Sequence, residues 1–390
     1  MKRDRQHHKK RAIVLTQAGG FSGIDDDLIR HLADRWELRV CRLPPTSRAQ
    51  RAADIIGSFS WPMARWKRRF ADRASRRPKS VEGFRRRTRC AGRMLAGTDG
   101  EYDVVLQISA LFAPGGDRTA APYVLYIDMT AAQACRVYPP WAFPERERDE
   151  WLGLEGDVYR GAARVLTFNQ AAADSVCRDY GVPADRIVTV GSGFEPSSIP
   201  AGVPQRETGM LVVSNDFARH GGNAVLETFR EVGRRIPQAG LEIVGAVVEE
   251  PGVISHLRLG RTALQKAYWR SSTLINLGPV GGLQSTLEGM ACGCVPVALR
   301  TNPHVGAIAS QYGVALDEVR VEKVASLLTQ LLLDEKGMRQ KSEACRNAAH
   351  ELYTWQAVVP RIDRALEEAA DPHSDSVAER RFERELAEWT

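Results

Sequence analysis

The feature that most constrains the fold is one local pattern that occurs twice in the chain. An apolar segment at 12–16 is followed by a loop with Gly19 and Gly20, and then by a helix with one apolar face. The same order returns at 210–235, where "MLVVS" precedes a loop with two glycines and a second amphipathic helix. Units of strand, glycine loop and helix build parallel sheets that helices cover. Two such units predict an α/β protein with two Rossmann-like domains.

The rest of the chain alternates in the same way, which indicates a parallel sheet in each half. Further strands are expected at 102–109, 123–128, 163–168, 186–191, 241–245, 273–276 and 295–299. Between the halves, the segment 191–209 is rich in Gly, Pro and Ser and has no apolar period, as is typical of a linker. The expected organisation is a first domain at 1–195, a linker at 196–209, a second domain at 210–354, and a C-terminal helix with a charged tail at 355–390.

The composition is that of a globular protein, because 43% of the 390 residues are apolar and 26% are charged. No apolar run approaches the roughly 20 residues that span a membrane. The basic N-terminus leads into a short apolar stretch at 12–15, which predicts a first strand rather than a secretory signal. Seven dispersed cysteines without a C-x-x-C pair are typical of reduced thiols, not of disulfides or zinc ligands. We therefore expect a cytoplasmic protein.

The charge is concentrated in one segment. Thirteen basic residues lie from Arg65 to Arg93, opposed only by Asp72 and Glu82, and four aromatic residues lie among or beside them: Trp61, Trp66, Phe70 and Phe84. Such a segment suits a solvated helix face, a nucleic-acid patch or a surface that docks on anionic lipid. Each Lys or Arg close to an anionic bilayer contributes about 1 kcal/mol, which favours peripheral membrane contact through 61–93. Nothing beyond charge indicates base recognition, so no nucleic-acid partner is expected.

The segment 280–298, "VGGLQSTLEGMACGCVPVA", carries the strongest indication of a ligand. Gly281 and Gly282 follow an expected strand and begin a helix, where backbone N–H groups can approach an anion closely. Glu288 lies about one and a half turns further on, and a carboxylate can accept hydrogen bonds from two neighbouring hydroxyls of a ribose. The spacing fits a nucleotide, with the phosphate at the helix start. It fits equally a helix with one acid at its rim.

The same segment resembles a known family. "LEGMACGCVPVA" is similar to the "LEAMACGxPVVA" element of the retaining GT-B glycosyltransferases of family 4. "HGGNAVLETFREVGRRIPQAGLEIVG", "DYGVPADRIVTVGSGFE" and "YTWQAVVPRI" resemble further elements of that family, in the right order. Together they cover most of 12–368. The resemblance implies two Rossmann-like domains that face one another across a cleft, the first on the acceptor side and the second holding the donor, with a C-terminal helix that crosses back to the first domain.

Residue by residue, the resemblance implies a donor site. Glu288 matches the second glutamate of the family's E-x7-E motif, which holds the donor ribose. Arg219 matches the arginine of the Arg/Lys pair that neutralises the donor diphosphate, and charge-assisted bonds of this kind contribute about 1.5–3 kcal/mol each. The glycines after the first strand, Gly19 and Gly20, match a loop that faces the diphosphate and the acceptor. The start of the donor helix completes the expected set with Gly281, Gly282, Leu283 and Gln284.

Three positions depart from the family pattern. The first glutamate of E-x7-E falls at Val280, the paired lysine at His220, and a histidine beside the anomeric carbon at Asp128. One interpretation is an enzyme with an unusual donor sugar, in which Arg219, His220 and Asp128 form the catalytic set. The alternative is a degenerate site in a non-catalytic scaffold or partner subunit.

The resemblance thus implies an enzyme that transfers a sugar from a nucleotide-diphosphate sugar to an acceptor hydroxyl with retention of configuration. The acceptor would be a glycan, a lipid-linked precursor or a small molecule, in the synthesis of cell-surface glycans or glycoconjugates at the inner face of the plasma membrane. No metal or other cofactor is expected. The D-x-D spacing in Asp25–Asp27 fits first-turn helix acids better than metal ligands. A dehydrogenase is disfavoured because "GGFSG" lacks the G-x-G-x-x-G spacing.

Overall fold

The computed structural model describes residues 9–17, 23–45, 55–61, 63, 65–66, 80–98, 102–115, 121–138, 145–196, 208–218 and 220–371. The chain divides into two compact units. Unit 1 comprises Met1–Val190 and Val359–Thr390, and unit 2 comprises Gly191–Val358. The expected linker at 196–209 lies mostly outside the described residues.

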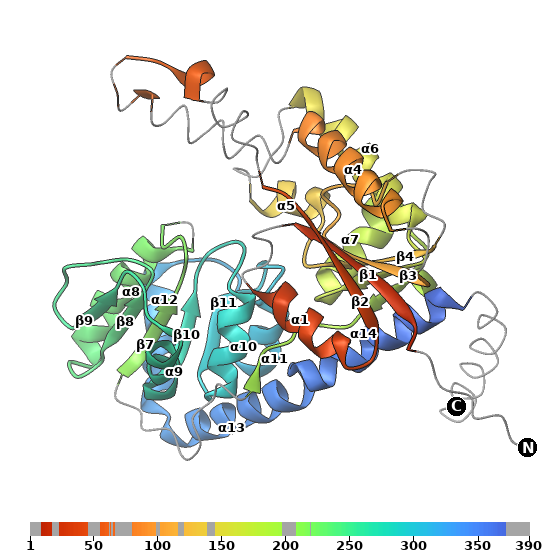
Figure 1. The fold of residues 1–390 in the computed structure, drawn as a ribbon. Helices are drawn as coiled ribbons and strands as arrows, with labels where there is room; N and C mark the ends of the chain where they lie inside the picture. Colours follow the sequence, from red (N-terminus) through yellow and green to blue (C-terminus); the bar gives the residue numbers. More distant parts are fainter. Residues whose placement is uncertain are drawn as a thin grey trace, which may run out of the picture. The chain divides into compact units, whose positions relative to one another are not determined.

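Unit 1 contains one parallel sheet with the strand order β2-β1-β3-β4-β5-β6 in its described part (Figure 1). Its strands are β1 (Arg11–Gln17), β2 (Glu37–Leu43), β3 (Val104–Ile108), β4 (Tyr123–Ile127), β5 (Arg164–Thr167) and β6 (Ile187–Thr189). Its helices are α1 (Ile24–Ala33), α4 (Val81–Ala96), α5 (Ala131–Val137), α6 (Glu145–Gly161), α7 (Gln170–Tyr180) and the short η3 (Ala184–Arg186). All five residues of β3 are buried, as expected for a central parallel strand covered on both faces.

The core of unit 1 fills the space between this sheet and its helices. One cluster joins β4 and β5 to α6 and α7, and Trp151 of α6 meets Phe84 of α4 edge-on with ring centroids 5.3 Å apart. A second cluster joins β1, β2 and β3 to α4. These two clusters fix the strands from which the polar loops of unit 1 depart.

Unit 2 repeats the architecture with the strand order β12-β11-β10-β7-β8-β9, again all parallel. Its strands are β7 (Thr208–Val213), β8 (Leu241–Val244), β9 (Val253–His256), β10 (Ser271–Asn276), β11 (Val295–Leu299) and β12 (Val314–Leu316). Its helices are α8 (Gly222–Arg235), α9 (Arg261–Arg270), α10 (Leu283–Ala291), α11 (Gly306–Tyr312), α12 (Val321–Leu333) and α13 (Glu335–Leu352). Its main core places α8, α10 and α12 against the sheet, with Leu287 and Met290 of α10 fully buried. The fold class predicted from the sequence is confirmed.

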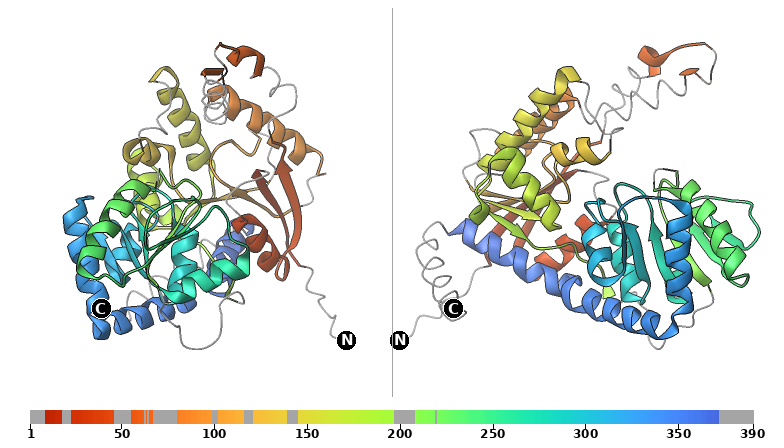
Figure 2. Two further views of the ribbon diagram at one scale, coloured as in Figure 1. Left: turned by 90° about the vertical axis from the view of Figure 1, so that its left-hand side faces the viewer. Right: turned by 180° about the vertical axis from the view of Figure 1, so that it is seen from behind.

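The last helix, α14 (Trp355–Ala370), begins in unit 2 and continues in unit 1. It follows α13 after only two residues (Figure 2). At its start, Thr354 pairs with Phe194 as an isolated bridge. Further along, Asp363 accepts hydrogen bonds from Trp36 Nε1 at 2.6 Å and Arg35 Nη1 at 2.7 Å. The predicted C-terminal helix that returns to the first domain is therefore confirmed.

Candidate functional site

The loop between β10 and α10 ends in two glycines whose backbone conformation favours glycine. Gly281 and Gly282 have φ angles of +84° and +87°, which side-chain-bearing residues rarely adopt. A Cβ atom on Gly281 would lie 2.8 Å from His220 Nε2, and one on Gly282 would lie 2.1 Å from Asn276 Nδ2. The glycines therefore allow two polar side chains to approach the backbone at the start of α10.

Two asparagines hold this loop in place. Asn276, the last residue of β10, donates from Nδ2 to the Gly281 carbonyl at 2.9 Å and accepts the Gly278 N–H at 3.0 Å. Asn302, which follows β11, donates to the carbonyl oxygens of Gly278 at 3.0 Å and Gly281 at 3.3 Å. The loop is thus anchored to the carboxyl ends of two adjacent strands.

His304 takes part in the same network. Its Nδ1 accepts the Gly281 N–H at 3.0 Å, and its own backbone N–H donates to Asn302 Oδ1 at 3.0 Å. Since Nδ1 is an acceptor here, the ring proton must be on Nε2. The Gly281 N–H is consequently used within the protein. An anion at this helix would meet the N–H groups of the first turn of α10, which have no acceptor within the helix.

His220 lies on the other side of Gly281. It follows β7 and is 7% exposed, and its Nδ1 lies 2.7 Å from the hydroxyl of Ser214, the residue directly after that strand. The Ser214 hydroxyl also accepts the Asp216 N–H at 3.0 Å. This arrangement leaves Nε2 of His220 facing Gly281. Two buried imidazoles therefore flank a single glycine at the start of α10.

Glu288 projects from α10 beyond this glycine. It is half-buried, and its Oε1 accepts a hydrogen bond from Gln284 Nε2 at 3.2 Å. Burial, and after it the charge of Glu288, raise the pKa of Tyr268 well above its ordinary value, which indicates that the carboxylate lies close to this tyrosine. Val280, at the position of the first glutamate in the E-x7-E motif that the sequence resembles, is buried.

The sequence-predicted residues are brought together only in part. His220, Gly281 and Gly282 lie together in unit 2, with Leu283, Gln284 and Glu288 following on α10. Asp128 belongs to unit 1, directly after β4. Arg219, Gly19 and Gly20 lie outside the described residues.

Unit 1 carries polar residues where its central strands end. Gln17 ends β1 and donates from Nε2 to the hydroxyl of Ser109, just after β3, at 3.3 Å. Ser109 has a φ angle of +76°, a conformation that costs a serine about 1–2 kcal/mol, and strained backbone of this kind clusters at functional sites. Buried Gln107 fixes it by donating to the carbonyl oxygens of Ser109 at 2.8 Å and Phe112 at 2.7 Å.

The acidic triplet at the start of α1 divides among separate partners. Asp25 is buried and accepts a hydrogen bond from Thr16. Asp26 pairs with Arg42 at 2.6 Å, and Asp27 pairs with Arg30 at 2.9 Å. Within the described residues, no group of three or more His, Cys, Asp or Glu side chains could hold a metal ion.

Several residues of the network around Gly281 in unit 2 and of the network around Ser109 in unit 1 were not predicted from the sequence. Ser214, Asn276 and Ser109 directly follow strands or end them, and Asn302 and His304 lie in the loop after β11. Polar residues at the carboxyl ends of parallel strands are the signal that could have identified them, because ligands bind at this edge of such sheets. The positive φ of Ser109 had no signal in the sequence.

Comparisons with known proteins agree with this fold. No protein-family model matches the sequence, and no curated protein matches it. Among solved structures, sucrose-phosphate synthase from Thermosynechococcus elongatus is similar with a TM-score of 0.65 at 14% identity, over 92% of this chain and 99% of that one. Anabaena HepE, solved with UDP and glucose, has a TM-score of 0.62 at 12% identity, over 92% and 100%. The α,α-trehalose 6-phosphate synthase from Burkholderia multivorans has a TM-score of 0.62 at 11% identity, over 93% and 99%. The chain therefore has the fold of the GT-B glycosyltransferases.

Proposed function

We propose that the protein is a glycosyltransferase that moves a sugar from a nucleotide-diphosphate sugar to an acceptor hydroxyl. The observation that carries this proposal is the start of α10. There a glycine turn, a buried imidazole against it and a carboxylate further along the helix supply polar groups that match the phosphate and the ribose of a nucleotide. The similar HepE structure, which contains UDP and glucose, makes UDP the first ligand to test.

In this proposal each part of the donor meets a group of matching chemistry. The diphosphate lies at the first turn of α10, where unpaired N–H groups and the helix dipole favour negative charge. His220 and Arg219 stabilise the charge that develops on the leaving diphosphate. Preorganised donors of this kind make the largest single contribution to the rate enhancement of many enzymes. The Glu288 carboxylate accepts hydrogen bonds from two ribose hydroxyls. Transfer proceeds with retention and without a metal, and Asp128 positions the acceptor or the transferred sugar.

The buried Val280 bears on which sugar is transferred. A valine cannot bind the hydroxyls that a glutamate binds, so we propose a donor whose sugar lacks or modifies them. The rival proposal, a non-catalytic scaffold, requires that the nucleotide site be lost. The loop network around Gly281 favours the enzyme, because two asparagines and a histidine preserve the glycine turn.

Calorimetry on the full chain tests the proposal, first with UDP and then with UDP- and GDP-linked sugars. We expect UDP to bind, and Glu288→Ala to weaken binding about tenfold through the loss of its hydroxyl contacts. Glu343→Ala, which removes an exposed acid of α13 in the same unit, is the matched control and should bind as the wild type does. Heat from NADH alone would support a dehydrogenase, and no heat from any nucleotide would support the scaffold.

We also propose that the protein works at an anionic membrane surface. Four side chains in the described parts of 56–63 are strongly exposed for their type: Ile56 (75%), Phe59 (71%), Trp61 (80%) and Met63 (50%). They precede the basic segment that ends at Arg93, so apolar insertion and charge attraction would act together. No described helix is long and apolar enough to cross a membrane.

Sedimentation with lipid vesicles tests this contact. We expect the protein to sediment with phosphatidylcholine vesicles that contain phosphatidylglycerol, and to stay in solution with phosphatidylcholine alone. Replacing Phe59 and Trp61 by Ala should reduce the bound fraction. Equal sedimentation with both kinds of vesicle, or no effect of the double substitution, would count against the proposal.

A further inference from the structure

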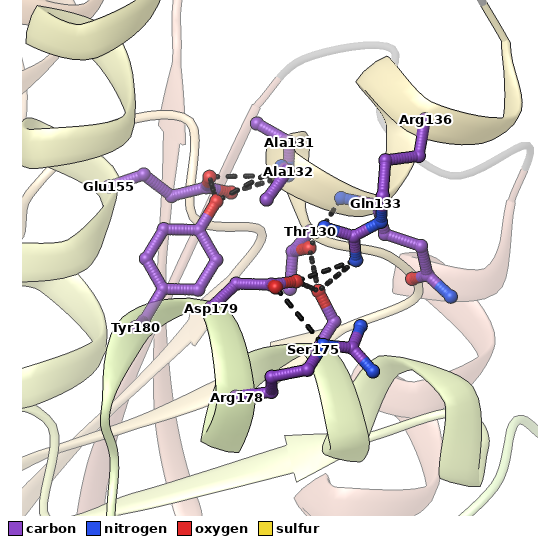
Figure 3. A network of polar contacts seen from close by, with 10 residues as sticks. All are labelled: Thr130, Ala131, Ala132, Gln133, Arg136, Glu155, Ser175, Arg178, Asp179 and Tyr180. Carbon is purple, nitrogen blue, oxygen red and sulfur yellow. Dashed lines mark hydrogen bonds and ion pairs between the residues drawn. The ribbon is translucent and has the colours of Figure 1, made fainter.

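A buried carboxylate in unit 1 lies directly behind the start of α5. Glu155 of α6 is 2% exposed, and its two oxygens accept the Ala131 N–H at 3.1 and 3.2 Å (Figure 3). Tyr159 donates to the same carboxylate at 3.1 Å, and Tyr180 of α7 donates to it as well. All of these partners are hydrogen-bond donors, which favour the ionised form of the carboxyl group against the burial that opposes it.

Two further side chains complete the first turn of α5. The Tyr180 hydroxyl accepts the Ala132 N–H at 3.1 Å. Thr130 accepts the Gln133 N–H at 3.0 Å, and its hydroxyl lies 2.6 Å from that of Ser175 on α7. The N–H groups of three successive residues, which begin α5 and would otherwise have no acceptor in the helix, are therefore each bound by a side chain.

This network fixes the position of α5 and of the loop that joins it to β4. A helix of seven residues such as α5 is too short to be stable alone, so its position depends on what holds it. The loop before it contains Asp128, and Asn169 donates to the Asp128 carbonyl at 3.3 Å while its own Oδ1 accepts the Ala172 N–H of α7 at 2.8 Å. The chain on both sides of the Asp128 side chain is thus tied to α6 and α7.

A purely structural role would be served more simply by apolar residues. Burying a carboxylate costs free energy even when it is well paired, and replacing such groups by apolar residues of similar volume is often neutral or stabilising. A carboxylate that accepts the Ala131 N–H, and that is itself held by Tyr159 and Tyr180, fixes the position of the loop more narrowly than apolar contact would. The network therefore suits a loop that must be held to a fraction of an ångström.

We propose that Glu155 and Tyr180 are positioning residues that hold the β4–α5 loop, and with it the Asp128 carboxylate, in the geometry required for sugar transfer. This inference rests on the proposed function. In this inference Glu155 and Tyr180 contact neither the donor nor the acceptor. They affect the reaction only through the position of the β4–α5 loop.

Two substitutions and one matched control test the inference. Glu155→Gln keeps the shape but loses half of the acceptor capacity, and Tyr180→Phe removes the hydroxyl that binds Ala132 N. The control is Tyr123→Phe. Tyr123, at the start of β4, donates to the Val158 carbonyl of α6 at 2.7 Å. The control therefore removes one partly buried hydroxyl between the same strand and helix, at the other end of the strand.

The measurement is the release of the nucleoside diphosphate, UDP from a UDP-linked sugar or GDP from a GDP-linked sugar, from whichever donor calorimetry shows to bind, with water as the acceptor. We expect both loop variants to lower kcat about tenfold at an unchanged donor KM, since sub-ångström misplacement of a reacting group has effects of this size or larger. Tyr123→Phe should lower the Tm about as much as the two loop variants do. It should keep kcat and the donor KM within about twofold of the wild-type values.

The outcomes separate the two proposals. If the wild type cleaves a nucleotide sugar and both loop variants retain its kcat, the positioning role is wrong and the proposed function stands. Equal losses of kcat in the loop variants and in Tyr123→Phe also overturn the inference, because they would follow stability alone. If the wild type binds and cleaves none of these sugars, the proposed function fails and the inference fails with it.

Discussion

At the scale of single residues, the site depends on a backbone conformation that strongly favours glycine. Gly281 serves three partners: His304 through its N–H, and Asn276 and Asn302 through its carbonyl. A fourth, His220, packs against its Cα. Any side chain at this position must therefore displace an imidazole while it also adopts a left-handed conformation.

We expect Gly281→Ala to weaken UDP binding about tenfold and to lower the free energy of unfolding by about 1–2 kcal/mol, the ordinary cost of a left-handed alanine. The new Cβ would lie 2.8 Å from His220 Nε2, a ring that Ser214 holds at its other nitrogen. Calorimetry and denaturant unfolding measure the two effects. Gly233→Ala is the control, because its Cβ meets nothing within 4 Å in α8, and it should gain up to about 1 kcal/mol. Unchanged UDP affinity in Gly281→Ala would show that the nucleotide does not bind at this turn.

Glu155 predicts a pH dependence of stability. Burial raises the pKa of Glu155 to about 7, although hydrogen bonds from Tyr180, Ala131 and Tyr159 oppose the rise. A carboxyl group with a raised folded pKa favours the folded state below its unfolded pKa, near 4.3, and that contribution is lost as the pH rises through about 7.

The difference in unfolding free energy between the wild type and Glu155→Gln isolates this contribution. We expect the wild type to lose up to about 3 kcal/mol relative to the variant between pH 4.5 and pH 8, since each pKa unit corresponds to about 1.4 kcal/mol. Urea unfolding of both proteins across this range measures it. A difference that stays constant with pH would mean that Glu155 keeps one charge state throughout.

At the scale of elements, periodic apolar segments were predictable and irregular ones were not. The strands β7, β10 and β11 were expected close to their observed bounds. β7 and β11 contain apolar runs before a turn, and β10 has Leu274 and Ile275 before one. The edge strand β2 was not expected, because charged residues interrupt the apolar ones in "ELRVCRL" and four of its seven residues are exposed. Its pairing with β1 defines it. The glycine turn and Glu288 were visible in the sequence, whereas the contacts of His304 and Glu155 join segments far apart in the chain. Spacing alone cannot reveal such contacts.

The attachment of α14 to the turn between α1 and β2 yields a prediction about elements. Asp363 accepts hydrogen bonds from Trp36 and Arg35 and is 8% exposed, whereas half of the Arg35 side chain is exposed. We expect Asp363→Ala to lower the free energy of unfolding by about 1–3 kcal/mol, mainly because the Trp36 N–H is left without its acceptor. The control Asp157→Ala removes an exposed pair with Arg160 and should change stability by less than about 0.5 kcal/mol. Equal effects in chemical unfolding would show that α14 is not held by Asp363.

At the scale of the whole molecule, the two units divide the proposed chemistry between them. The groups proposed to hold the nucleotide that the structure describes belong to unit 2, whereas Asp128 and the network behind it belong to unit 1. Each unit has its own sheet and its own core clusters. A ligand bound by one unit should therefore stabilise that unit first.

Hydrogen–deuterium exchange with mass spectrometry can test this division. UDP at about a hundredfold its Kd stabilises the folded form that binds it by about 2.7 kcal/mol. Exchange in β7, β10 and α10 should slow accordingly, because their amides open with the unit that holds the nucleotide. Exchange in β3 and β4 of unit 1 should change little. If UDP protected the strands of unit 1 as strongly as those of unit 2, the nucleotide site could not be assigned to unit 2 alone, and the proposed roles of His220 and Glu288 would have to be shared with residues of the other sheet.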